Sequence, residues 1–145
     1  MTGADCCPEC GAPPVDGLDC WGQLGLILSW EGENPALAAQ HFLTVACWNL
    51  QHPAQFTDAA LDGLRAAFVA HLDEGTAVPE IRRRMGALVA GTTRVLRREP
   101  DRHPIQRLWA FNVADVCAGG NSSGAAPRVR TWAETIRAAL GSPGA

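Results

Sequence analysis

Apolar side chains recur every three to four positions along most of this chain, the spacing that places them on one face of an α-helix. In the first such segment Trp21, Leu24 and Ile27 follow this spacing, and we predict a helix over residues 21–30. No stretch of useful length alternates apolar and polar residues, as a half-buried β-strand would. The pattern therefore favours an all-α protein.

The remaining predicted helices are bounded by prolines, glycines and residues that cap helix ends. They cover residues 35–52, a segment that begins after Thr57, residues 79–98, a short segment that begins after Asn112, and residues 127–140. Between them we expect a charged loop at 99–104 and a flexible linker at 119–124. Trp21, Trp48 and Trp132 are expected in the core.

The first two predicted helices are joined by only about three residues, so they should be antiparallel neighbours. Counting outward from this turn places Cys20 opposite about position 47. Side chains at the start of the first helix should therefore lie near the end of the second.

The first candidate metal ligands lie near the N-terminus, in the sequence C-P-E-C-G at residues 7–11. The spacing of Cys7 and Cys10 presents two sulfurs to one metal ion, and the glycine lets the chain curl back so that its amides face the sulfurs. Cys20 offers a third soft ligand. Three sulfurs and one histidine nitrogen suit tetrahedral zinc.

The predicted hairpin ranks the candidates for the fourth ligand. His52 is the first choice and Cys47 the second, because both lie at the end of the second helix that faces Cys20. His41 is the third, since it would lie about 9 Å further along at 1.5 Å per residue. His41 could instead be a capped core or surface histidine, or a functional base. The predicted fold is thus a small helical bundle with an N-terminal zinc-knuckle loop held against a helical hairpin.

Length and composition limit the possible classes of protein. The 145 residues suit a single domain, 1–145, with a zinc-knuckle loop (1–20), a helical core (21–98) and C-terminal helices (105–140). The net charge of −3 argues against a general nucleic-acid binder, and the run Arg82–Arg84 favours a solvated helix face.

The expected compartment is the cytoplasm. The N-terminus lacks the basic and apolar regions of a secretory signal, and no apolar run approaches the roughly 18 residues of a membrane span. In a reducing compartment the six cysteines are metal ligands or free thiols rather than disulfides. Cys47 and Cys117 lie in apolar stretches and fit small core residues, and Cys6 is a spare thiol or an alternative ligand.

Several short motifs occur together: C-P-x-C-G at 7–11, C-W at 20–21, H-x-L-T-V at 41–45, Q-H-P at 51–53, V-A-D-V at 113–116 and V-R-x-W-A at 129–133. Over nearly the whole chain they resemble an uncharacterised bacterial family, domain of unknown function 5946. The resemblance implies a small, mostly helical protein with a metal site and supplies no activity.

Three functions are compatible with these residues. In the first, zinc is structural: Cys7, Cys10, Cys20 and His52 close the site, and the protein acts by binding a protein or small-molecule partner. In the second, the protein is a metal-dependent enzyme with an open zinc position and an assisting histidine. In the third, it is a cysteine-based redox protein. We expect no nucleic-acid or membrane partner, and an exposed apolar helix face would allow a homodimer.

Overall fold

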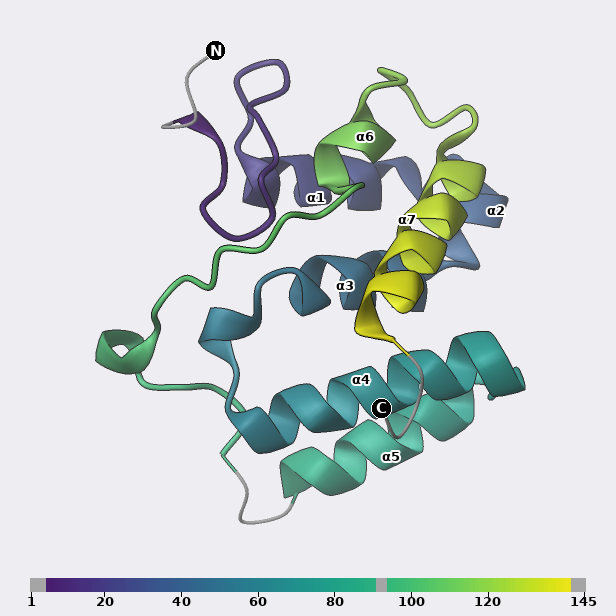
Figure 1. Cartoon of the computed structure of the whole chain (residues 1–145). Helices are drawn as coiled ribbons and strands as arrows, with labels where there is room; N and C mark the ends of the chain where they lie inside the picture. Colours follow the sequence, from purple (N-terminus) through teal and green to yellow (C-terminus); the bar gives the residue numbers. More distant parts are fainter. Residues whose placement is uncertain (1–4, 91–93, 142–145) are drawn as a thin grey trace. The chain divides into compact units, whose positions relative to one another are not determined.

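The computed structural model describes residues 5–90 and 94–141, apart from the side chains of Leu88 and Val89. The described residues form seven α-helices and no strand (Figure 1). The helices are α1 (Cys20–Trp30), α2 (Pro35–Ala38), α3 (His41–Leu50), α4 (Asp58–Glu74), α5 (Val78–Ala90), α6 (Val113–Cys117) and α7 (Ala125–Leu140). The predicted all-α class is confirmed. In the ranges given above, none of the helices is both long and apolar enough to cross a membrane.

Contacts divide the chain into two compact units. The first comprises Met1–Gln51 and Gln106–Ala145, where α1 packs against α6, and α7 packs against α2, α3 and α6. The second comprises His52–Ile105, where α4 packs against α5. The single domain expected from the sequence stays a prediction.

The predicted antiparallel hairpin is formed by α1 and α3, whose opposite ends are joined by side-chain bonds. At one end the Trp48 indole of α3 donates to the carbonyl of Cys20, at 3.3 Å. At the other end Nδ1 of His41 lies 2.9 Å from a carboxylate oxygen of Glu31. Cys20 thus faces position 48, one residue from the position expected from the sequence.

The continuous helix predicted over 35–52 is wrong. It is divided into α2 and α3 by a turn at Ala39–Gln40. The local sequence favours a helix here, so tertiary packing causes the break. Leu37 is fully buried, and α2 and α3 each pack against α7.

In the second unit Thr57 is the N-cap of α4, as predicted, and its side chain accepts a hydrogen bond from the amide of Ala60. Leu61, Leu64 and Phe68 are buried along one face of this helix. These residues give α4 the amphipathic pattern on which its prediction depended.

The helix predicted over 79–98 ends earlier than expected, at Ala90. Residues 94–97 are extended, because their backbone pairs with residues 55–57 instead of continuing the helix. The amide of Thr57 donates to the carbonyl of Val95, and the amide of Arg97 donates to the carbonyl of Gln55, each at 2.9 Å. Part of the predicted segment, residues 91–93, lies outside the described residues.

The predicted solvated face of α5 is confirmed. The side chains of Arg82–Arg84 are exposed, and two of them form ion pairs with Glu80. These neighbouring guanidinium groups lower the pKa of Glu80 to about 2.

The C-terminal helices begin and end close to the predicted residues. Asn112 caps α6 in a capping box with Asp115, which is therefore the helix-end carboxylate that its position indicates. α7 begins two residues before Pro127 and ends at Leu140, with Gly141 as its C-cap. The predicted flexible linker between them is held by Arg128, whose guanidinium donates to the carbonyls of Val116, Asn121 and Ser123.

Candidate metal centre

The knuckle loop, residues 7–12, folds back on itself around two cysteines. The amide of Gly11 donates to the carbonyl of Cys7, and the amide of Cys7 donates to the carbonyl of Ala12, each at 3.0 Å. Gly11 has a φ of +79°, a left-handed conformation that glycine adopts without steric cost. This tight turn places both sulfurs on the same side of the loop.

Backbone amides of the loop face these sulfurs. The amide of Cys10 lies 3.4 Å from Sγ of Cys7, and the amide of Ala12 lies 3.4 Å from Sγ of Cys10. Such N–H donors stabilise negative charge on sulfur, the form in which cysteine binds a metal. The loop therefore has the local geometry of a thiolate metal ligand pair.

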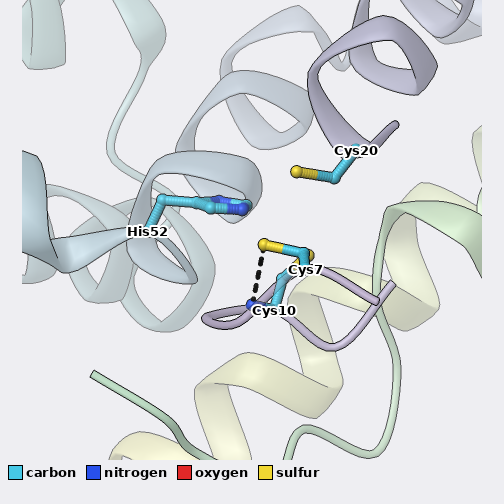
Figure 2. Close-up of side chains that lie close together, drawn as sticks. All are labelled: Cys7, Cys10, Cys20 and His52. Atoms are coloured by element: carbon cyan, nitrogen blue, oxygen red, sulfur yellow. Dashed lines mark hydrogen bonds between the residues drawn. The ribbon is translucent and has the colours of Figure 1, made fainter. Parts of the chain in front are cut away.

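The other two candidate ligands come from the hairpin. Cys20 is the first residue of α1, where Asp19 caps the helix by accepting from the amide of Gly22. His52 directly follows Gln51, the C-cap of α3, and it is buried. Figure 2 shows the His52 ring directed toward the sulfurs of Cys7, Cys10 and Cys20.

The four side chains converge closely enough to hold one metal ion. Their ligand atoms, three sulfurs and one ring nitrogen, all lie within 4.8 Å of one another. A zinc–sulfur bond of about 2.3 Å gives a tetrahedral edge of about 3.8 Å, so a separation of 4.8 Å would need to shorten by about 1 Å on binding an ion. The donor set and its geometry fit a tetrahedral ion that prefers sulfur and nitrogen.

Crowding of the sulfurs has an electrostatic consequence for Cys10, the most buried of the three cysteines. Its pKa is raised, first by the adjacent side chains of Cys20 and Cys7 and then by burial. A negative charge at this position is unfavourable without a cation. A bound divalent cation reverses this preference, because it deprotonates coordinating thiols.

The alternative fourth ligands lie elsewhere. His41 is at the other end of the hairpin, where it pairs with Glu31. Cys47 is fully buried in α3, and burial raises its pKa. Among the described residues the converging group contains neither of them, nor Cys6. The group that could hold a metal ion thus includes His52, the first choice made from the sequence.

One aromatic residue near the cluster is not where the sequence placed it. Trp48 and Trp132 are buried, as predicted, but Trp21 is 67% exposed. Its ring packs edge to face on Trp48, with the centroids 5.2 Å apart. Helical spacing put Trp21 on the inner face, but its position in the first turn of α1 leaves most of the ring outside.

Sequence reasoning missed the polar residues that support the candidate site. Gln51 is fully buried, donating to the carbonyl of Phe111 at 2.8 Å and accepting from the indole of Trp132 at 3.1 Å. The amide side chain of Asn112 donates to the carbonyl of Cys10, at 3.3 Å. Asn112 was identifiable from the sequence as a helix cap, and Gln51 only as the neighbour of His52.

The fold and the cluster define a small all-α protein with a Cys3His group that could hold a metal ion. The chain belongs to the family described as Family of unknown function (DUF5946), which matches residues 5–141 and confirms the resemblance found in the sequence. No curated protein and no solved structure matches the chain.

Proposed function

We propose that this protein binds one zinc ion through Cys7, Cys10, Cys20 and His52, and that the zinc is structural. The observation that carries the proposal is the convergence of three sulfurs and one imidazole nitrogen within 4.8 Å. Four protein ligands complete a tetrahedral shell and leave no position for substrate, which is the arrangement of structural zinc sites.

The ligands come from three separate segments of the chain, so a bound metal would connect these segments. The knuckle loop, residues 7–12, has no helix of its own, whereas Cys20 begins α1 and His52 follows α3. Zinc would attach this loop to one end of the hairpin. Because such a site does not exist in the unfolded chain, the free energy of metal binding adds to the free energy of folding.

If the zinc is structural, the activity of the protein depends on its helices. We propose that the protein acts by binding a protein or small-molecule partner, in the cytoplasm. The exposed ring of Trp21 supports such a role, because tryptophan is enriched at interfaces and often dominates their binding energy.

Metal content tests the proposal. We expect about one zinc per wild-type chain by plasma mass spectrometry, and loss of zinc in both Cys10→Ser and His52→Ala. Each variant has a matched control: Cys117→Ala removes a buried thiol outside the cluster, and His41→Ala removes the histidine at the far end of the hairpin. Both controls should retain zinc.

The other outcomes separate the alternatives. Zinc lost from Cys10→Ser but retained by His52→Ala would mean an open position or another fourth ligand, and would favour a metal-dependent enzyme over a structural site. A wild-type chain that binds no zinc, and whose Cys7 and Cys10 thiols react rapidly, would favour the redox function. Circular dichroism of each variant distinguishes loss of metal from loss of fold.

A further inference from the structure

The segments that carry the candidate ligands are held by residues from the C-terminal part of the chain. We call Gln51, Phe111, Asn112 and Trp132 the support network. Its hydrogen bonds connect Trp132 of α7 and the two residues before α6 to Cys10 and to Gln51, the neighbour of His52. All its hydrogen bonds are made by groups that are buried or partly buried.

The first branch of the network reaches His52 through its neighbour. Both polar atoms of the Gln51 side chain are used, one by the carbonyl of Phe111 and the other by the indole of Trp132. A fully buried amide with both ends bonded has a single orientation. The backbone that leads into His52 is therefore fixed by contacts to the connection before α6 and to α7.

The second branch reaches Cys10 directly. Asn112 uses its side-chain oxygen to cap α6, accepting from the amide of Ala114 at 3.0 Å, and its side-chain nitrogen to donate to the carbonyl of Cys10. One side chain thus sets both the start of α6 and the position of the knuckle loop. Phe111 and Asn112 are adjacent, so the same short segment holds both branches.

From this arrangement we infer that metal binding is thermodynamically coupled to the docking of α6 and α7, with Gln51, Asn112 and Trp132 as positioning residues for the metal site. This inference rests on the proposed function and adds a means of regulation to it. Binding of a metal would tighten the docking of the C-terminal helices, and a partner that displaces them would weaken metal binding by the same factor.

Two substitutions remove one hydrogen-bond donor each and leave the rest of the side chain's role in place. Asn112→Ser retains a good N-cap residue but lacks the amide that reaches Cys10. Trp132→Phe retains an aromatic ring in the core but lacks the indole N–H that Gln51 accepts. Replacing residues that hydrogen-bond metal ligands typically weakens metal binding 10- to 100-fold. Because Asn112 and Trp132 act on the backbone near the ligands rather than on the ligand atoms, we expect the lower end of this range, about tenfold weaker binding, in each variant.

The chain offers a matched control for each substitution. Asn34 is also an N-cap asparagine, of α2, and its side-chain nitrogen donates to the carbonyl of Ser122 at 2.8 Å, away from the ligands. Trp30 is also a buried tryptophan, at the end of α1 opposite to Cys20. Asn34→Ser and Trp30→Phe should lower stability yet weaken metal binding much less than their matched variants. The Asn34 bond reaches only the connection between α6 and α7, not the knuckle loop or Gln51.

The experiment is a competition titration of zinc against a chromophoric chelator, repeated with Co²⁺ to record the ligand-field spectrum of the bound ion. Coupling predicts weaker binding in Asn112→Ser and Trp132→Phe and a changed cobalt spectrum in at least one of them. It also predicts slower exchange of the Trp132 indole N–H when metal is added, with the Trp30 indole unchanged.

Failure of this inference can be distinguished from failure of the proposed function. Wild-type protein that binds zinc, with Asn112→Ser and Asn34→Ser equal in metal affinity, would show that the support network is only structural. A wild-type chain that binds neither zinc nor cobalt would overturn the proposed function, and with it this inference. Equal loss of stability with and without metal in Trp132→Phe would also contradict coupling.

Discussion

Cysteines in this protein occupy three different environments. Cys7, Cys10 and Cys20 converge with His52, Cys47 and Cys117 are buried in helices, and Cys6 is partly exposed beside the knuckle loop. Burial raises the pKa of Cys47, and it raises that of Cys117 to about 11. Because the thiolate is the reactive form, both thiols should be inert near neutral pH.

A thiol-labelling experiment tests these environments. In zinc-loaded protein at neutral pH we expect one rapidly labelled cysteine, Cys6. A chelator should make Cys7 and Cys20 available, and denaturant should add the remaining three of the six, because Cys10 is as buried as Cys47 and Cys117 and its pKa is also raised. Raising the pH toward 11 should begin to label Cys117, since its thiol loses its proton only there.

Mass spectrometry of the labelled peptides identifies which cysteines have reacted, and Cys6→Ser serves as the control that abolishes the rapid phase. Rapid labelling of Cys47 or Cys117 in the native protein would contradict the environments described above.

Among the helices, the start of α4 combines two contacts in one side chain. The Thr57 hydroxyl accepts from the amide of Ala60 as an N-cap and donates to the carbonyl of Arg94 in the extended segment. Thr57→Ala removes both bonds and should lower the free energy of unfolding by at least about 1 kcal/mol, the usual cost of losing an N-cap.

Denaturant unfolding measures this change, with Thr131→Ala as the control. Thr131 is exposed on α7, and its hydroxyl bonds only to the carbonyl of Pro127 within the same helix. Alanine has the higher helix propensity, so this control should not lose stability. Equal losses in the two variants would mean that the cap of α4 contributes nothing specific.

The predictable part of the fold was the set of helix ends that are marked by a capping residue in the local sequence. Thr57, Asn112 and Gly141 each marked a boundary through local chemistry that does not depend on the rest of the chain. The break at Ala39–Gln40 and the end of α5 at Ala90 were not predictable, because packing on α7 and pairing with residues 55–57 decide them.

The candidate site was predictable for a related reason. Metal ligands are few in kind and close in spacing, so Cys7, Cys10 and Cys20 were recognisable, and the short connection of the hairpin selected His52. The support of the site was not predictable, because Gln51 and Trp132 are 81 positions apart and their bond depends on the packing of α3 on α7.

At the scale of the whole molecule, Cys7, Cys10, Cys20 and the support network belong to the first unit, and His52 is the first residue of the second. The helices α4 and α5 pack on each other, and their described residues include no candidate ligand. Removal of zinc should therefore act unequally along the chain. We expect faster amide hydrogen exchange in residues 7–20, at the start of α1 and at the start of α6.

Hydrogen exchange with mass spectrometry, with and without chelator, measures this difference. Amides of α4 and α5 are the internal reference and should change little. The Cys10→Ser variant should reproduce the effect of the chelator without further response to it. Uniform acceleration across all helices would instead show that the metal stabilises the chain as one cooperative unit.

The order of these residues along the chain also sets an order in time. Cys7, Cys10, Cys20 and His52 leave the ribosome before residue 53, whereas Asn112 and Trp132 follow only after most of the chain has been made. During synthesis, N-terminal parts of a chain are generally the first to fold. We therefore expect the ion to bind first to a loose site during translation, and the later docking of α6 and α7 to slow its exchange. A ribosome stalled between these two points would carry a loaded but exchangeable site, so the availability of zinc during synthesis would matter more than its availability afterwards.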